Sequence, residues 1–553
     1  MSTLNILIGS DSFRKLRENN CYYVDKTGFL EEMLASTPPE VSLITRPRRF
    51  GKTLNMSMLQ EFFDIQKDSM QLFEGLDVSK NARLCDGWMN KYPTLYLTFK
   101  NIEGRNYELA CGQMAELLQR VCIDHAWLQE SDKVDPVEKA KLAVLKKGEG
   151  SETDMVNALN LLCRALEAHY GKQVILLIDE YDVPINHAEQ NGYYQEMIGF
   201  MRNLLGAALK TNPSLKFAVL TGCLRIARES IFTGLNNFMC CSVSDTEYAD
   251  KFGFTESDVD KRLTDADLLH RKPEFKEWYD GYRFGDGSEM YCPWDILAHV
   301  SKLQKNPKAQ PLAYWNNTSG NAIVRTLISQ SSPEIRQKIE DLINGKAIEE
   351  KLCEDLTYDL VYENESNIWT MLYLTGYLTK APTQPDNDST ALIIPNKEVR
   401  KIFTEKFSEW FNDSLSKRDL PKMVNAAWNG DTETMQAMIT DILYDTISYH
   451  DSKESFYHGF LSGLIRGAGI AIKSNREQGL GRTDIVIEDG RNKRAIIFEL
   501  KKADKYEELD KKADEALVQI EEKKYAAGLS PHIKTVLKYG IAFWDKECCV
   551  KLA

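Results

Sequence analysis

The chain lacks an apolar run long enough to cross a membrane. The nearest candidate, Gly459–Ile472, carries Arg466 in its middle, whereas a membrane-spanning helix needs about 20 consecutive apolar residues. The opening residues, MSTLNILIGSDSF, also lack the basic-then-apolar layout of a signal peptide. We therefore expect no membrane partner and a cytoplasmic location.

Cysteine pairs with metal-binding spacing are missing as well. The 12 cysteines stand singly or as adjacent pairs, and none form a CxxC arrangement. This pattern excludes a zinc ribbon and favours buried, reduced thiols. An excess of positive charge is also absent, because the net charge is −13. That argues against a broad basic surface that binds nucleic acid, although local basic patches remain compatible with this charge.

What the chain does have is length and an ordinary globular composition. It contains 553 residues, of which 43% are hydrophobic and 27% charged. Because single cores stop growing near about 250–300 residues, we expect several domains.

The segment Arg46–Thr53 (RPRRFGKT) predicts a phosphate-binding loop. It follows the apolar run Val41–Thr45 and precedes a helical pattern over Leu54–Phe63, which is the strand–loop–helix setting of GxxxxGK(S/T) sites. We expect Lys52 to reach the β- and γ-phosphates and Thr53 to hold Mg²⁺. Gly51 and the helix N-terminus would offer backbone N–H groups to the anion.

The first glycine of that pattern is absent, and Arg46 stands in its place. Pro47, Arg48 and Arg49 fill the loop interior, where glycine normally lets the backbone approach phosphate. The arginines either add charge-assisted phosphate contacts, which makes Arg46 and Arg49 candidate nucleotide-binding residues, or stiffen the loop and slow turnover. The alternative is a basic surface turn with a chance GKT.

A second stretch, Val174–Asp182 (VILLIDEYD), supplies acids at the end of an apolar strand. Asp179 there can hold the magnesium, and Glu180 can orient or deprotonate water. With the phosphate loop upstream, the pair predicts an ATP or GTP site.

The first half alternates strands with helices, which predicts an α/β fold with a parallel sheet covered on both faces. The expected elements are strands at Pro93–Phe99, Val174–Asp179 and Leu215–Thr221 and helices at Tyr107–Cys122, Met155–Tyr170 and Tyr194–Leu209. We expect the strands ending at Asp179 and Thr221 to lie beside the phosphate-loop strand. Thr221 is then a candidate γ-phosphate sensor. Arg225 or Arg228 would stabilise transition-state charge, unless both lie on a solvated helix.

The predicted domains are residues 1–244, a helical lid at 245–348 with the string WYDGYRFGDG (Trp278–Gly287), a spacer at 349–445, and a last domain at 446–553. The spacer combines a helix with a β-hairpin, as in winged-helix elements. These can read DNA, but no arginine cluster marks a recognition helix, which favours a structural spacer.

The last domain predicts a second carboxylate site. Asp484 opens one strand, and Glu499 and Lys501 end the next, where strand alternation places them on one face. Two acids and a lysine suit a divalent-metal hydrolysis site: the acids bind Mg²⁺ or Mn²⁺, and the lysine positions water. Glu454 would add a metal ligand.

Two further observations bear on this site. We expect Gln519 and Tyr525 to lie on a following helix, from which they would contact substrate. The basic residues nearby suit a phosphate-backbone partner; they are Arg491, Lys493, Arg494, Lys501, Lys502 and Lys505. The alternative is a charged surface strand.

The motif strings together resemble a known family. YYVDKT at Tyr22–Thr27, RPRRFGKT, IDEYDVP at Ile178–Pro184 and ESIFTGLNN at Glu229–Asn237 look like AAA-ATPase-like proteins of anaerobic gut bacteria. ESFYHGFL, GRTDIVI, IIFELK and QIEEKKY in the tail resemble their PD-(D/E)xK nuclease-superfamily domain. The resemblance implies a P-loop ATPase joined to a restriction-endonuclease-like fold. It implies that Asp484, Glu499 and Lys501 form the nuclease core, and that an arginine-rich phosphate loop is the family's own.

These observations favour an ATP-dependent enzyme acting on DNA. Two other hypotheses stay open: a nucleotide-sensing switch whose nuclease-like domain binds without cutting, and an ATPase that acts on protein partners or assembles as a homo-oligomer.

Overall fold

The computed structural model describes residues 4–225, 232, 238–285, 287–315, 333–353, 356, 360–361, 364–416, 419–445, 454–470, 473–478 and 481–553. They fall into two compact units. One comprises residues 1–320 and 347–402, and the other residues 321–346 and 403–553. The division of the chain into four domains that the sequence predicts stays a prediction.

The first unit is built on a parallel sheet whose strand order is β2-β3-β4-β1-β5. Its strands are β1 (Val41–Thr45), β2 (Thr94–Thr98), β3 (Val174–Asp179), β4 (Leu215–Gly222) and β5 (Phe238–Cys241). In the described residues β1, β3 and most of β4 are buried along their length. That is the pattern of a sheet covered on both faces, and it confirms the predicted fold class.

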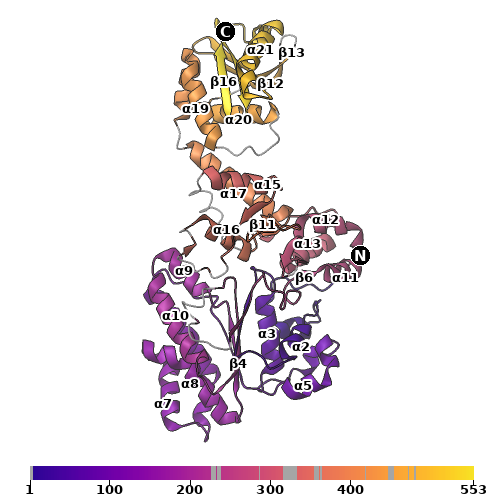
Figure 1. Cartoon of the computed structure of the whole chain (residues 1–553), viewed down its shortest axis with the longest axis vertical. Helices are drawn as coiled ribbons and strands as arrows, with labels where there is room; N and C mark the ends of the chain where they lie inside the picture. The colour runs from indigo at the N-terminus through magenta and orange to yellow at the C-terminus, as the bar shows by residue number, and fades with distance from the viewer. Residues whose placement is uncertain are drawn as a thin grey trace. The chain divides into compact units, whose positions relative to one another are not determined.

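Helices cover the two faces of this sheet, as Figure 1 shows around β4. The helices of this region are α1 (Phe13–Glu18), α2 (Gly28–Leu34), α3 (Lys52–Phe63), α4 (Met70–Phe73), α5 (Ala82–Trp88), α6 (Tyr107–Asp124), α7 (Pro136–Lys147), α8 (Glu152–Tyr170), α9 (Val183–Asn191) and α10 (Tyr194–Leu209). Capping residues set several boundaries. Ser151 and Asp154 form a capping box at the start of α8, and Gly171, in the left-handed conformation, ends it.

One predicted neighbour relation differs from the structure. The strand ending at Asp179 was expected beside the phosphate-loop strand, but β4 lies between β1 and β3. The expected adjacency of β4 and β1 is present, with Leu43 opposite Leu220. Apolar runs of equal strength carry no information on sheet order, so the sequence leaves this order open.

The region predicted as a helical lid also contains a sheet. Three short strands pair antiparallel in the order β6-β8-β7. The elements are β6 (Phe254–Thr255), α11 (Glu256–Asp265), α12 (Lys272–Tyr279), β7 (Tyr282–Phe284), β8 (Ser288–Tyr291) and α13 (Pro293–Lys305). A spacer-like element follows, with a second three-stranded sheet; it comprises β9 (Ile348–Glu350), α16 (Glu365–Leu374), β10 (Thr379–Lys380), β11 (Thr390–Ile393) and the start of α17 (Lys397–Ser416).

The second unit carries a mixed sheet in the order β12-β13-β14-β15-β16. Its elements are α15 (Pro333–Ile343), α18 (Leu420–Asn429), α19 (Thr432–Asp445), α20 (Glu454–Gly467), β12 (Lys473–Gln478), β13 (Gly481–Asp489), β14 (Arg494–Lys502), α21 (Leu509–Glu522), β15 (Thr535–Trp544) and β16 (Glu547–Leu552).

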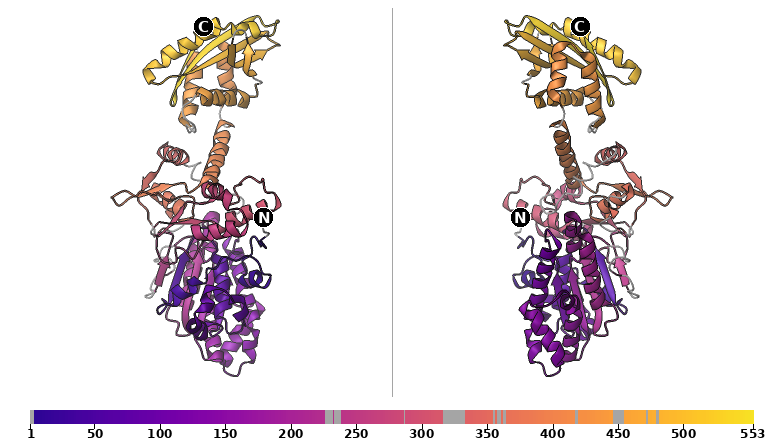
Figure 2. Two further views of the ribbon diagram at one scale, coloured as in Figure 1. Left: turned by 90° about the vertical axis from the view of Figure 1, so that its right-hand side faces the viewer. Right: turned by 90° about the vertical axis from the view of Figure 1, so that its left-hand side faces the viewer.

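The two faces of this sheet carry different helices. Residues of α18, α19 and α20 share a core with Phe498 and Ile541, and Figure 2 shows these orange helices beside the yellow sheet. Residues of α21 pack on the other face against Ile497 and Ala542. Gly540 permits this approach, because a side chain there would lie 2.2 Å from the carbonyl oxygen of Ala513.

Two general features agree with the composition. All twelve cysteines are free thiols. Among the described residues, every helix is too short or too polar to traverse a lipid bilayer.

Candidate functional site

The phosphate loop turns sharply between β1 and α3. Gly51 immediately precedes α3 with φ of 86°, and Arg49 also has a positive φ, of 72°. Gly51 adopts that conformation without strain, whereas Arg49 does so at a cost. The loop therefore delivers the first N–H groups of α3 to the edge of the sheet where β1 ends.

Lys52 points into the loop that precedes it. Its ammonium donates to the carbonyl oxygens of Arg46 at 3.1 Å and Pro47 at 3.3 Å, and it lies 3.6 Å from the Glu180 carboxylate. Burial alone disfavours the charged ammonium, but the anionic groups around it, Cys223 when ionised and then Glu180, outweigh burial and raise the pKa of Lys52. A cation is thus fixed inside the loop.

The Asp179 carboxylate is hydrogen-bonded by hydroxyl groups from three neighbouring elements. It is fully buried and accepts hydrogen bonds from Thr53 at 2.8 Å, Thr221 at 2.6 Å and Thr98 at 3.4 Å. Burial, and then the charge of Glu180, raises the pKa of Asp179. The structure therefore brings together the carboxylate and the hydroxyl that were predicted to hold magnesium, and Thr221 beside them.

Glu180 stands at the point where β3 turns into α9. Its φ is 54°, a costly conformation for a residue with a side chain. The next two residues hold this turn in place: Tyr181 donates to the Leu224 carbonyl at 2.8 Å, and Asp182 accepts from the N–H groups of Cys223 and Leu224 at 2.9 and 3.1 Å. These bonds tie the end of β3 to the end of β4 and direct Glu180 toward Lys52.

Arg46 takes a different position from the predicted one. Its side chain is fully buried, and its guanidinium donates to the carbonyl oxygens of Thr45, Cys241, Ser242 and Glu247 at 2.8, 2.9, 2.8 and 3.1 Å. Burial lowers the pKa of Arg46 to about 10. A guanidinium committed to four main-chain carbonyls anchors the segment after β5, so a phosphate contact does not fit this position.

The other arginines that were predicted near the nucleotide lie in different environments. Arg49 is exposed and stacks 4.2 Å from the centre of the Trp294 ring, so its cation is held near the loop surface. Arg225 is half-buried just beyond β4. Arg228 lies outside the described residues. The predicted transition-state role of Arg225 stays a prediction.

In the second unit, β13 and β14 bring the predicted acids together. Ile485 pairs with Phe498, so the next position along places Asp484 opposite Glu499, with both side chains on one face. Asp484 accepts a hydrogen bond from the Leu500 N–H at 2.9 Å, and burial raises its pKa. The Lys501 ammonium lies 3.8 Å from the Glu499 carboxylate.

The helix α21 supplies the next contacts. Gln519 donates to the Glu499 carboxylate and, at 3.2 Å, to the Tyr525 hydroxyl, which places both predicted residues beside the acids. Glu454 begins α20, but its side chain lies outside the described residues. The sequence analysis missed His458, whose Nε2 lies 2.9 Å from the Asp484 carbonyl; a lone histidine on an apolar helix gives no signal.

Comparison with known proteins assigns a part of each unit to a family. The family model described as predicted AAA-ATPase matches residues 7–232, and the PD-(D/E)XK nuclease superfamily model matches residues 452–552. Residues 7–232 belong to the predicted AAA-ATPase family, and residues 452–552 to the PD-(D/E)XK nuclease superfamily. A protein of Azotobacter chroococcum, called an uncharacterized protein in the vnfD 5′ region, is 28% identical over 411 residues, which are 73% of this chain and 70% of that protein.

The surface around the PD-(D/E)XK residues carries both signs of charge. An open cavity of 410 Å³ lies beside Lys501 and Gln519. Its other lining residues, from α21 and just beyond it, are Lys511, Asp514, Glu515, Val518, Glu522 and Lys523. The three lysines in this lining attract phosphate and the three acids repel it, so the cavity has no net charge to attract a polyanion.

Two of the predicted basic residues lie near acidic side chains. Arg494 pairs with Asp489 at 3.1 Å and stacks 4.2 Å from the centre of the Trp428 ring. Lys502 lies 4.0 Å from Asp504. Arg491, Lys493 and Lys505 are exposed. The AAA-ATPase region and the nuclease-superfamily region thus each present a set of converging residues, with weak local attraction for nucleic acid in the second.

Proposed function

We propose that the chain binds and hydrolyses ATP at the AAA-ATPase region and that this site controls a metal-dependent nuclease-like site that acts on DNA. The observation that carries the proposal is the meeting of Thr53, Asp179 and Thr221 in one hydrogen-bonded set, with Lys52 and Glu180 3.6 Å apart beside it.

The donor set fits a nucleotide with Mg²⁺. Carboxylate and hydroxyl oxygens are the ligands that Mg²⁺ takes. Asp179 at the end of β3 and Thr53 in the first turn of α3 supply one of each. When bound, the ion would neutralise charge on the phosphates. Lys52 would exchange its main-chain carbonyl partners for phosphate oxygens, and Glu180 would then be freed to hold a water molecule.

The proposal for the second site rests on Asp484 and Glu499 as metal ligands and Lys501 as the residue that positions water. Asp484 accepts one main-chain N–H, and Gln519 orients the Glu499 carboxylate. Oxygen ligands of this kind suit Mg²⁺ or Mn²⁺.

One observation favours a second candidate function. Asp514, Glu515 and Glu522 line the cavity next to Lys501, and acids there oppose the approach of a polyanion. A nucleotide-dependent switch whose nuclease-like site binds a partner without cutting is therefore the second candidate.

Lys52→Ala tests the nucleotide site. It removes a charge-assisted contact that contributes about 1.5–3 kcal/mol, so calorimetric affinity for ATP–Mg²⁺ should fall about tenfold or more. Lys80→Ala is the matched control, because Lys80 is an exposed lysine paired only with Asp77 among the partners described for it. Equal affinity in the Lys52 variant and the parent would refute the phosphate-loop assignment.

Glu180→Gln tests turnover on the same protein. The amide keeps the shape of the side chain but cannot accept a proton from water, so binding should persist while the hydrolysis rate falls about a hundredfold or more. Undiminished hydrolysis in this variant would show that another acid orients the attacking water, and Asp182 would then be the next candidate to test.

A further inference from the structure

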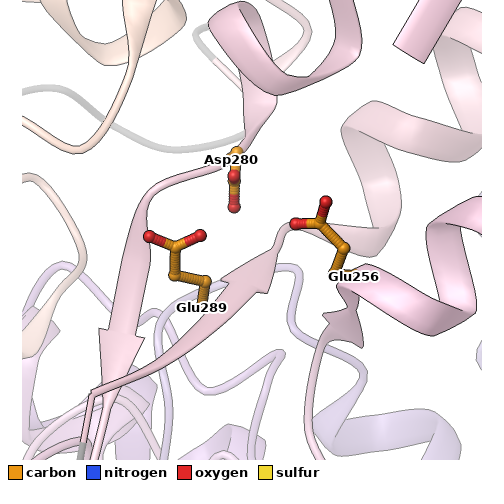
Figure 3. A group of neighbouring side chains, drawn as sticks. All are labelled: Glu256, Asp280 and Glu289. Carbon is orange, nitrogen blue, oxygen red and sulfur yellow. The ribbon is translucent and has the colours of Figure 1, made fainter. Parts of the chain in front are cut away.

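Three carboxylates that belong to neither set of residues described above meet in the lid. Glu256 is the first residue of α11, Asp280 follows α12 directly, and Glu289 lies in β8. One oxygen of each lies within 4.8 Å of the others. Figure 3 shows Asp280 pointing into the space between Glu256 and Glu289.

Asp280 is the unusual member of this group. It is 4% exposed, and its Oδ1 has no hydrogen-bond partner among the described residues. Its other oxygen lies 3.7 Å from the Lys276 ammonium. Burial of a carboxylate costs free energy unless hydrogen bonds or a cation compensate it. A cation that binds Oδ1 would therefore stabilise the folded protein.

A cation already lies among the three acids, but only Glu256 accepts a hydrogen bond from it. The Lys276 ammonium is 3.3 Å from Glu256 and 3.7 Å from both Asp280 and Glu289. Close ion pairs in the same neighbourhood are shorter, at 2.7 Å for Lys272 with Glu256 and 2.8 Å for Arg283 with Glu289. Lys276 is half exposed, so its long side chain can leave for solvent.

We propose that Glu256, Asp280 and Glu289 bind a divalent cation, and that this cation displaces the Lys276 ammonium. Carboxylates from three separate elements favour Ca²⁺, which takes oxygens at about 2.3–2.6 Å in flexible geometry, so oxygens within about 4.8 Å of one another can share one ion. Mg²⁺ demands near-ideal octahedral geometry at about 2.1 Å. The remaining positions would be filled by water.

The location gives the ion a structural role next to the nucleotide loop. Asp280 and Glu289 flank β7, whose Tyr282 and Phe284 rings pack 5.0 and 5.3 Å from the ring of Phe50 in the phosphate loop. The N–H of Gly253, just before β6, donates to the Phe50 carbonyl at 3.1 Å. An ion that joins α11, the end of α12 and β8 would therefore fix the elements against which the phosphate loop packs.

Calorimetric titration of Ca²⁺ tests the proposal. The full chain carries Asp484→Asn and Glu499→Gln in every sample and contains no nucleotide, so that the nuclease-like acids do not contribute. Adding Asp280→Asn or Glu289→Gln should weaken Ca²⁺ binding at least tenfold. Lys276→Met should strengthen it at least threefold, because the competing cation is gone. Glu277→Gln, which alters an exposed neighbour paired with Lys397, should leave it unchanged.

The Lys276 variant separates a metal site from a cluster held by lysine alone. A simple ion-pair cluster predicts that Lys276→Met loses thermal stability and gains no Ca²⁺ affinity, and that result would overturn the proposal. Ca²⁺ isotherms that are identical with and without Asp280→Asn would do the same. If Asp280→Asn does not fold, as judged by circular dichroism, the gain in affinity of Lys276→Met decides alone. A tighter isotherm for Mg²⁺ than for Ca²⁺ would overturn the choice of ion.

Discussion

Arg46 shows how a single buried charge holds the phosphate loop to the rest of the sheet. Its guanidinium satisfies main-chain carbonyls at the ends of β1 and β5 and beyond, and it lies 5.5 and 5.6 Å from the ring centres of Phe252 and Phe284. Removal of this group leaves buried acceptors without donors, which costs more than the bonds contribute on balance.

Arg46→Met should therefore lower the free energy of unfolding by about 3 kcal/mol or more. The reason is loss of hydrogen bonds to a buried charge, and thermal or denaturant unfolding measures it. Arg49→Met is the matched control, because Arg49 is exposed and should shift stability little. A stable Arg46 variant that has lost ATP affinity would instead support the phosphate contact predicted from sequence.

A second residue-scale feature is a buried carboxyl pair, Asp295 of α13 and Glu398 of α17. They are 1% and 0% exposed, and each carboxyl shifts the pKa of the other. Burial raises the pKa of Asp295 to about 6. Burial and then the charge of Asp295 raise the pKa of Glu398 to about 10. Two acids this close share a proton at neutral pH.

This pair makes stability depend on pH. Both folded pKa values lie above the ordinary values of 3.8 and 4.5, so the folded state keeps protons that the unfolded chain has lost. The stability linked to those protons is fully present below about pH 4 and is lost as pH rises through about 6 and toward about 10.

Glu398→Gln should remove part of this loss. The amide donates to Asp295 without needing a proton, so the variant should exceed the parent in stability by on the order of 2 kcal/mol at pH 8 and differ little at pH 4.5. Unfolding midpoints across this range measure the difference, with the exposed Glu277→Gln as control. A variant less stable than the parent at pH 8 would show that the shared proton is not the cause.

At the scale of elements, the turn after β3 depends on its close approach to the end of β4. A side chain at Gly222 would place Cβ 2.6 Å from the Tyr181 ring and 2.7 Å from Asp182 Oδ1. Those residues hold Glu180 in position. Glycine is thus required where the turn after β3 contacts the end of β4.

Gly222→Ala should slow ATP hydrolysis at least tenfold while ATP affinity changes less, because it moves Glu180 rather than the loop that holds the phosphates. Steady-state hydrolysis and calorimetry measure the two effects. Gly206→Ala, in α10 with open space around its Cβ position, should retain full activity. Equal hydrolysis rates for the two variants would mean that the strand ends tolerate separation.

The sequence predicted elements where periodicity was long and strong. The strand at Val174–Asp179 and the helix at Tyr194–Leu209 coincide with β3 and α10. The strands of the lid sheet span two to four residues, which is too short for a period to register. β12 reads KSNREQ and has no apolar alternation, yet it pairs with β13 at the sheet edge.

In the candidate sites, too, general sequence rules predicted some neighbours and missed others. Strand alternation correctly placed Glu499 near Lys501, and the common edge at which parallel strands end placed Asp179 and Thr221 on the same side of the sheet, because both follow from general rules. The burial of Arg46 depends on Cys241, Ser242 and Glu247, which lie about 200 positions away in sequence, and local patterns carry no trace of them. The same holds for the three acids of the lid, which come from three elements.

At the scale of the whole molecule, one chain carries two sites of different chemistry. The first unit contains the nucleotide residues and the start of α17, and residues of the same helix beyond position 402 belong to the second unit. A net charge of −13 and the mixed charge beside Lys501 reduce general attraction to DNA. We therefore expect cleavage, where it occurs, to be strongest at low ionic strength.

Cleavage of nucleic acid with and without ATP is the most direct test of the proposed coupling. Linear, supercoiled and single-stranded DNA, and RNA, are incubated with Mg²⁺ or Mn²⁺ and the parent, Asp484→Ala or Lys52→Ala. The account predicts metal-dependent cutting of DNA by the parent, none by Asp484→Ala, and loss of the ATP effect in Lys52→Ala. No cutting by the parent under any condition, or equal cutting by Asp484→Ala, would contradict it and leave the non-cleaving switch as the function.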